Sequence, residues 1–261
     1  LTASGEVVSL AEQDRSLWDR ALVAEGTALL DATLGGGPPG SYQVQAAIAA
    51  VHDRARRASD TDWPQVLALY GLLEEVAPLL RAADVAFGNL EGPLVDSGTS
   101  DKCARSRPGR CYAFRVPTRY GRHLADAGLD VLGLANNHVG DFGDAGRAST
   151  RAVLAANGIR FSGAPGEVAR LDVRGTRVAV VAFSTSGGTN DVRDLPEAAR
   201  IVAAAAADAD LVVVSFHGGA EGADHQHVPP GREEFLGEDR GDLRAFARAV
   251  VDAGADLVLG H

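Results

Sequence analysis

Residues 131–146, VLGLANNHVGDFGDAG, place an apolar run directly before a loop that is rich in polar side chains. The run at 131–134 is short and is typical of a buried strand. A strand that ends in a cluster of potential ligands indicates a functional site. The candidate residues of this loop are Asn136, Asn137, His138 and Asp141.

Short apolar runs rich in β-branched residues recur elsewhere, and amphipathic helical stretches separate them. This alternation predicts an α/β domain. The other predicted strands cover 85–87, 178–183, 211–216 and 257–259, and two of the predicted helices cover 119–127 and 242–253.

Polar residues follow these runs as they follow residues 131–134. In open α/β sheets the ligand crevice lies beyond the carboxyl ends of the strands, so we expect these loops to converge on one site. The remaining candidates are Asn89 and Glu91 after the first run, His217 and Glu221 after the fourth, and His261 after the last.

Imidazole, carboxylate and amide oxygen ligands suit divalent Zn, Mn or Fe ions. Two such ions close together bind a phosphate and supply hydroxide near neutral pH, which is hydrolytic chemistry. Each residue taken alone has a structural alternative. Asn136 and Asn137 also suit a turn, His138 a hydrogen-bonded core position, and Glu91 the start of a helix.

The formal net charge of −10 over 261 residues argues against a broad nucleic-acid-binding surface. No apolar run is long enough to span a bilayer. The chain contains no Met and begins at Leu1, so we expect that the start of the gene product is missing or was removed by processing, and we treat both ends as truncation points.

Cys103 and Cys111 flank a short segment rich in Arg, Pro and Gly. This spacing favours a disulfide and an oxidising compartment. Two free thiols in a reducing compartment are the alternative.

Residues 1–75 contain only helical patterns, and we expect an all-α segment there. Its single histidine, His52, lies among arginines and is predicted to be a solvated surface residue. The predicted apolar faces are Trp18, Ala21, Leu22 and Leu29 in the first helix, Val44, Ala47, Ile48 and Val51 in the second, and Trp63, Val66, Leu67 and Tyr70 in the third.

This segment resembles the helical, tetratricopeptide-like C-terminal region of extracytoplasmic-function RNA polymerase sigma factors. The closest matches are Gln13-Asp14-Arg15, residues 42–49 and Asp60-Thr61-Asp62-Trp63. The resemblance implies a cytoplasmic, transcription-linked module that contacts polymerase. The promoter-binding regions of such factors are absent from this segment, so no direct nucleic-acid binding is expected.

Residues 73–261 resemble the CapA family of capsule and poly-γ-glutamate biosynthesis proteins, within the calcineurin-like metallophosphoesterase superfamily. Four segments carry the resemblance in order: ADVAFGNLEGPL, GLANNHVGDFGDAG, VVVSFHGGAE and GADLVLGH. It implies a layered α/β domain over 76–261, extracytoplasmic or associated with the cell envelope. It also implies an anionic polymer or phosphoester substrate and a possible capsule-synthesis membrane complex as partner.

The resemblance also assigns roles to single residues. Glu91, Asn137, His217 and His261 match metal-ligand positions for two divalent ions, Mn, Fe or Zn. His138 matches the catalytic histidine, which binds phosphate or protonates a leaving group. The residues expected to surround the ligands or contact substrate are Asn89, Asn136, Asp141 and Glu221, with the Cys103–Cys111 loop at the rim.

Two departures from the family pattern weaken this expectation. Family members begin with a strand that ends in Gly-Asp, whereas the most similar dipeptide near the start of this sequence is Gly5-Glu6. The chain also stops at His261, before the later histidines of the last motif, so we expect a domain cut short at its C terminus. A site without these ligands is expected to bind metal weakly, or to bind one ion, and to have poor activity.

Overall fold

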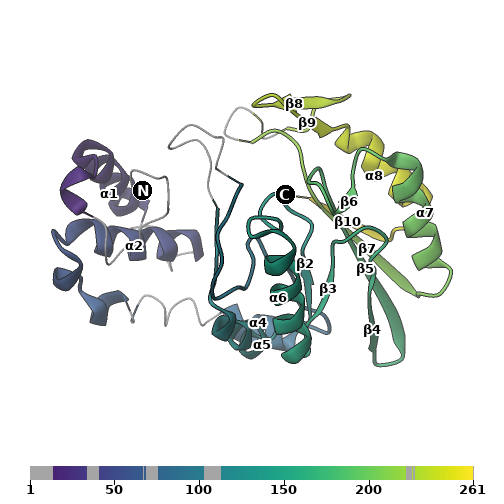
Figure 1. The fold of residues 1–261 in the computed structure, drawn as a ribbon, viewed down its shortest axis with the longest axis horizontal. Helices are drawn as coiled ribbons and strands as arrows, with labels where there is room; N and C mark the ends of the chain where they lie inside the picture. The colour runs from purple at the N-terminus through teal and green to yellow at the C-terminus, as the bar shows by residue number, and fades with distance from the viewer. Residues whose placement is uncertain are drawn as a thin grey trace. The chain divides into compact units, whose positions relative to one another are not determined.

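The computed structural model describes residues 14–33, 41–66, 68, 76–102, 113–221, 225 and 227–260. Cys103, Cys111 and His261 lie outside the described residues. The chain forms two compact units, one comprising 1–82 and 108–110 and the other 83–107 and 111–261 (Figure 1). Within the described ranges, no helix combines the length and apolar character needed to cross a membrane.

The first unit is helical, as predicted. Its core is formed by Val44, Ile48 and Val51 of the second predicted helix, which pack with Val66. The predicted face of the first helix is wrong, because Leu22 and Leu29 are 65% and 63% exposed whereas the adjacent Leu30 is buried. The elements are η1 (Arg15–Leu17), α1 (Arg20–Thr33), α2 (Ser41–Arg54), η2 (Ala58–Asp60) and α4 (Val76–Ala82).

His52 is only 9% exposed, which corrects its prediction as a solvated residue. It lies in the last turn of α2, where the buried Arg15 donates to the carbonyl oxygens of His52 at 2.7 Å and Ala55 at 3.2 Å. These are carbonyls that a helix end leaves without intrahelical partners. The ring of Trp63 lies edge-on to His52, with 5.5 Å between the ring centroids.

The second unit contains two main sheets and a hairpin. The smaller sheet, β1-β2-β3, is parallel throughout, and the larger sheet has the order β10-β7-β5-β4 with only β4 antiparallel. The short β6 pairs with β5, and β8 pairs with β9. The strands are β1 (Phe87–Asn89), β2 (Val131–Gly133), β3 (Arg160–Ser162), β4 (Ala169–Val173), β5 (Thr176–Ser184), β6 (Asn190–Asp191), β7 (Leu211–His217), β8 (Glu233–Phe235), β9 (Glu238–Gly241) and β10 (Leu257–Gly260).

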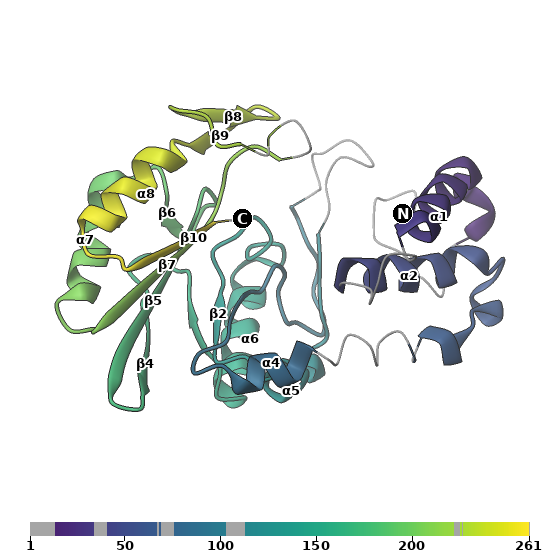
Figure 2. The same cartoon turned by 180° about the vertical axis from the view of Figure 1, so that it is seen from behind.

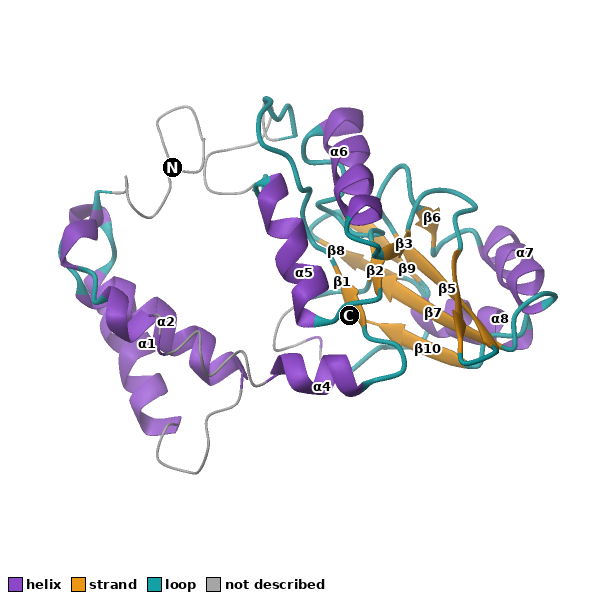
Figure 3. Cartoon of the chain, turned by 90° about the horizontal axis from the view of Figure 1, so that it is seen from below, coloured by secondary structure: helices purple, strands orange, loops and turns teal. Residues whose placement is uncertain are grey.

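The two main sheets pack face to face, and helices cover their outer faces (Figures 1 and 3). Val131 of β2 packs against Val178 and Val180 of β5 between the sheets. The next residue, Leu132, points to the opposite face and packs with Leu154 of a helix, as the alternation of side chains along a strand requires. The helical layers are η3 (Thr118–Tyr120), α5 (Gly121–Ala127) and α6 (Gly143–Ala156) on one side, and α7 (Leu195–Ala206) and α8 (Leu243–Asp252) on the other.

This helix-sheet-sheet-helix arrangement confirms the predicted layered α/β fold. The strand predicted at 85–87 begins two residues later, so Asn89 is the last residue of β1 instead of following it. The predicted helix at 242–253 corresponds to α8, whose N-cap Asp242 accepts a hydrogen bond from the backbone of Ala245.

Three aspartates that each precede a strand form a repeated contact at the amino ends of the sheets. The carboxylate of Asp130, before β2, accepts from the backbone N–H of Ala86 at 2.8 Å. Asp210, before β7, accepts from Arg177 at 2.9 Å, and Asp256, before β10, accepts from Val212 at 2.8 Å. Each aspartate therefore joins its own strand to the neighbouring one.

Candidate functional site

Asn136 connects the ends of β1 and β2. Its side chain is fully buried, and its amide donates to Oδ1 of Asn89 at 3.1 Å and to the carbonyl oxygen of Leu90 at 2.9 Å. Its own Oδ1 accepts from the backbone N–H of His138 at 3.0 Å. The three contacts fix the loop after β2 against the end of β1.

His138 is buried in the same loop, and its Nδ1 lies 2.7 Å from Oδ2 of Asp141. Oδ2 also accepts from the backbone N–H of Phe114 at 2.7 Å. The Phe114 ring packs against the imidazole, with 4.3 Å between centroids. These contacts orient the ring with Nδ1 engaged, so that Nε2 is the ring nitrogen available to a ligand.

Lys102 completes this cluster and was missed in the sequence analysis. Its Nζ lies 2.5 Å from Oδ1 of Asp141, 3.1 Å from Nδ1 of His138 and 2.8 Å from the carbonyl oxygen of Asn137. Because Asp141 is only 1% exposed, the ammonium group compensates a buried carboxylate. One sequence signal exists, since Lys102 is the single lysine of the chain.

Glu91 and Asn137, two predicted metal ligands, are exposed near the ends of β1 and β2. Asn89 joins them to the buried part of the loop, because it accepts from Asn136 and its Nδ2 lies 3.5 Å from Oε2 of Glu91. The side chain of Asn137 makes no hydrogen bond to the described residues, whereas its backbone oxygen binds Lys102. These oxygen donors therefore face outward from a rigid support.

His217 ends β7 and is half-buried, and in the sheet it pairs with Ser184 at the end of β5. The loop after β5 approaches the loop after β2 through Arg147 of α6, which donates to the carbonyl oxygen of Gly187 at 3.3 Å. A small cavity between these loops is lined by Leu134, Val139, Arg147, Thr150, Gly163 and Thr189, among others.

Glu221, predicted near the ligands, forms an ion pair with Arg240 of β9 at 3.2 Å. The hairpin β8–β9, seen from behind in Figure 2, thus contacts the loop that follows β7. Glu233 of this hairpin is 8% exposed, and its Oε1 lies 3.5 Å from the backbone nitrogen of Ala220. Glu221 is therefore engaged in a structural contact.

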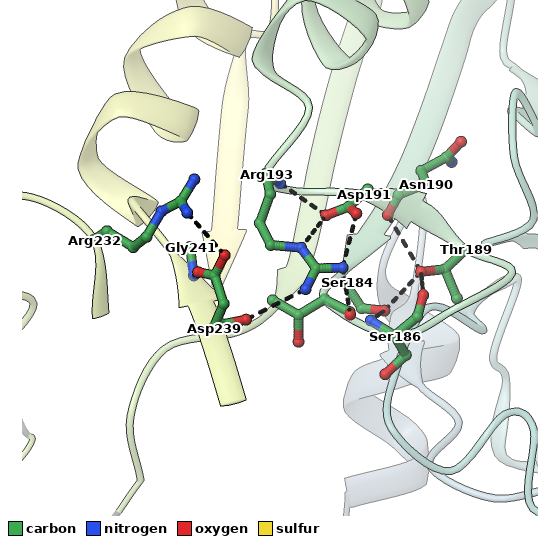
Figure 4. Close-up of polar contacts among 10 residues, drawn as sticks. Ser184, Ser186, Thr189, Asn190, Asp191, Arg193, Arg232, Asp239 and Gly241 are labelled. Atoms are coloured by element: carbon green, nitrogen blue, oxygen red, sulfur yellow. Dashed lines mark hydrogen bonds and ion pairs between the residues drawn. The ribbon is translucent and has the colours of Figure 1, made fainter. Parts of the chain in front are cut away.

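Arg193 joins the loop after β5 to the same hairpin (Figure 4). Its guanidinium binds both oxygens of Asp191 at 2.8 Å and donates to the carbonyl oxygens of Thr185 at 2.8 Å and Asp239 at 3.4 Å. Burial raises the pKa of Asp191, but the hydrogen bonds from Arg193 outweigh it and bring the pKa below its usual value.

The structure thus brings together Asn89, Glu91, Asn136, Asn137, His138 and Asp141 around the ends of β1 and β2, whereas Glu221 pairs with Arg240. In the described part of the chain, no group of three or more His, Cys, Asp or Glu side chains lies close enough together to hold a metal ion. The predicted metal ligands therefore stay a prediction, and His261 and the two cysteines lie outside the described residues.

The paired sheets, their outer helices and the polar loops at the strand ends define a metallophosphoesterase-like α/β domain. Residues 49–261 match the family described as bacterial capsule synthesis protein PGA_cap, and the chain belongs to this family. Residues 1–34 match a family of unknown function, DUF6596, which leaves the sigma-factor resemblance a prediction.

Curated proteins that are similar in sequence to this chain include members named for capsule biosynthesis. The chain is 28% identical over 211 residues to the capsule biosynthesis protein CapA of Bacillus anthracis, covering 73% of this chain and 47% of that protein. It is 28% identical over 207 residues to the PGA biosynthesis protein CapA of Bacillus subtilis, covering 73% and 50%. An uncharacterized protein of Rhizobium meliloti is 46% identical over 96 residues, covering 35% and 22%. The chain therefore spans half or less of the length of these relatives.

Proposed function

We propose that the second unit binds a divalent metal ion, Mn, Fe or Zn, beside the ends of β1, β2 and β7. We further propose that it acts there on a phosphoester or an anionic polymer during capsule synthesis. The observation that carries the proposal is the contact between His138 and Asp141 at 2.7 Å, in the loop that exposes Asn137. It places an oriented imidazole next to an outward-facing amide oxygen.

The chemistry of the donor atoms supports a divalent Mn, Fe or Zn ion. Glu91 and Asn137 offer oxygen and His217 offers nitrogen, a mixture that suits borderline ions better than soft ones. His261, outside the described residues, is the fourth proposed ligand. When bound, such an ion supplies Lewis-acid activation and a hydroxide near neutral pH.

The residues around this position have distinct tasks in the proposal. Asn136 holds the loop rigid, and Asp141 keeps the Nδ1 side of His138 occupied. His138 then presents Nε2 to the substrate, where the ring accepts a proton when neutral and, once protonated at both nitrogens, donates a hydrogen bond to a phosphate oxygen or a proton to a leaving oxygen. The oriented ring removes rotational freedom that would otherwise be lost on reaching the transition state.

The names of the two Bacillus relatives support an anionic capsule polymer as the wider context. Both are named as biosynthesis proteins, one for capsule and one for PGA. On this basis we propose a role at the cell envelope, within a capsule-synthesis complex.

Metal binding and turnover test the proposal separately. Isothermal titration with Mn²⁺ should show binding that Asn137→Ala and His217→Ala each weaken by at least about tenfold. His123→Ala is the matched control, because His123 is exposed on α5. Equal Mn²⁺ binding by the wild type and the three variants would show that Asn137 and His217 are not metal ligands.

Hydrolysis of bis(p-nitrophenyl) phosphate with Mn²⁺ tests the role of His138. His138→Ala should lower kcat by about 100-fold or more, as expected for loss of a general acid. Unchanged kcat in a folded variant would contradict the assignment.

A second candidate function, a protein-interaction module, concerns the first unit alone. It is favoured by the exposure of Leu22 and Leu29, which lie seven positions apart on one face of α1. The test is capture of purified RNA polymerase subunits by the intact chain. Binding should be lost in the Leu22→Ser, Leu29→Ser double variant, and an absence of binding would discard this candidate.

A further inference from the structure

The 25 basic residues of the chain include a single lysine, Lys102, and the structure places its ammonium, on a side chain that is 28% exposed, against the buried carboxylate of Asp141. Its Nζ lies within 3.1 Å of the carbonyl oxygen of Asn137, Nδ1 of His138 and Oδ1 of Asp141. All three partners come from the loop after β2. A single ammonium group therefore fills the centre of this loop.

The shape of the group explains why lysine suits this position. An ammonium is a compact charge with three donors in a tetrahedral arrangement, whereas a guanidinium is a planar fork. All three partner atoms lie within 3.1 Å of the one nitrogen atom, as they would around a small bound cation. Oδ1 of Asp141 and the oxygen of Asn137 are the ligand types that hard cations prefer.

The position of Lys102 also couples two candidate functional residues. The side chain of Asn137 points outward while its carbonyl oxygen binds Nζ, and the imidazole of His138 lies against the same atom. The carboxylate of Asp141 is buried, and a buried carboxylate without a compensating charge is strongly unfavourable. Removing the ammonium should therefore leave the Asp141 carboxylate without its compensating charge and free the Asn137 carbonyl oxygen, while the contacts of Asn136 remain.

We propose that the ammonium of Lys102 is a built-in cation, occupying the place that an exchangeable ion would otherwise take in this loop. Lys102 is then a positioning residue that holds Asn137 and His138 in a fixed relation. The proposal rests on the contacts of Lys102 alone and goes beyond the proposed metal chemistry.

Chemical rescue tests this directly, with EDTA present so that divalent metals play no part. Lys102→Ala should lower the Tm, and ethylammonium chloride should restore a large part of the loss. Choline chloride at the same concentration should restore none, because choline has no N–H donor. Lys102→Met fills the space without charge, so it should be destabilised and should not respond to ethylammonium.

The conservative variant provides a further outcome. Lys102→Arg should remain destabilised, since a planar guanidinium fork is larger than the compact ammonium that fits against the oxygens of Asp141 and Asn137. Equal recovery with choline and ethylammonium, or wild-type stability of Lys102→Met or Lys102→Arg, would overturn the proposal.

A measurement on the wild-type protein gives an outcome that does not depend on how Lys102 variants fold. Because the chain has one lysine, ¹⁵N-lysine labelling produces a single side-chain ammonium resonance. Its protons should exchange slowly enough to be observed at 25 °C in the wild type and in the control Asp144→Asn, whose carboxylate is fully exposed. The signal should be lost in Asp141→Asn, and rapid exchange in the wild type, as in free lysine, would overturn the proposal.

Discussion

The side-chain amide of Asn136 donates to Oδ1 of Asn89 at 3.1 Å, so a fully buried amide joins the ends of two neighbouring strands. Asn137, the next residue, points outward and its side chain binds none of the described residues. Two adjacent asparagines thus have opposite environments, which makes them a matched pair for mutation.

Asn136→Ala should destabilise the protein by about 2 kcal/mol, because it removes three hydrogen bonds and leaves a buried carbonyl without its donor. Asn137→Ala should change the free energy of unfolding by less than about 0.5 kcal/mol. Urea unfolding of the two variants measures the difference. Equal destabilisation would mean that the contacts of Asn136 do not hold the loop.

Gly163→Ala should destabilise the protein by about 1–3 kcal/mol through overpacking. A Cβ at this position would lie 2.8 Å from the backbone nitrogen of Ala135 and 2.8 Å from the carbonyl carbon of Leu134, and backbone atoms cannot easily move away. Gly187→Ala is the control, because a Cβ there meets nothing within 4 Å. Thermal unfolding that shows equal effects would contradict this account of the close approach.

Arg193→Lys should cost about 1 kcal/mol, because lysine cannot bind both oxygens of Asp191 and reach the Thr185 carbonyl together. Hydrogen exchange should also become faster at residues 185–189. Arg200→Lys is the control, since Arg200 makes a similar two-point contact with Glu197 on the exposed surface of α7. Similar losses in both variants would show that the additional contacts of the partly buried Arg193 contribute no more stability than an exposed ion pair does.

Asp210 should make stability depend on pH at acid values. The side-chain hydrogen bond from Arg177, followed by its backbone hydrogen bond, lowers the pKa of Asp210 to about 2. Because the pKa is lower in the folded state, the stabilisation is complete above about pH 4 and is lost as the pH falls towards 2. The urea midpoints of the wild type and Asp210→Asn should therefore converge over this range, and a constant difference would contradict the prediction.

Much of the fold could be predicted from the sequence because several strands are continuous apolar runs, whether they are mostly buried, as β5 is, or mostly exposed, as β10 is. Residues 211–216 and 257–259 differ from β7 and β10 by single residues at their ends. Periodicity failed for α1, where Leu22 and Leu29 suggested a buried face that the packing places in solvent. Local pattern identifies an amphipathic helix but does not show which of its adjacent leucines has a partner.

In the candidate site, too, contacts within one segment could be predicted from the sequence, whereas contacts between distant segments could not. Asn136, His138 and Asp141 lie on one loop, so their proximity follows from local sequence. Lys102 is separated from Asp141 by 39 positions, and no local pattern predicts that contact. His52 was misjudged for a similar reason, since its burial depends on Arg15 and Trp63 from other segments.

Asp130, Asp210 and Asp256 have a consequence for how this domain tolerates change. Each one joins two strands at their amino ends, whereas Asn137 follows β2 and His217 ends β7 at the carboxyl ends. These three contacts involve no residue of the loops at the carboxyl ends. Loop sequences at the carboxyl ends, and ligand preference with them, can therefore change while these contacts still hold the register of the neighbouring strands.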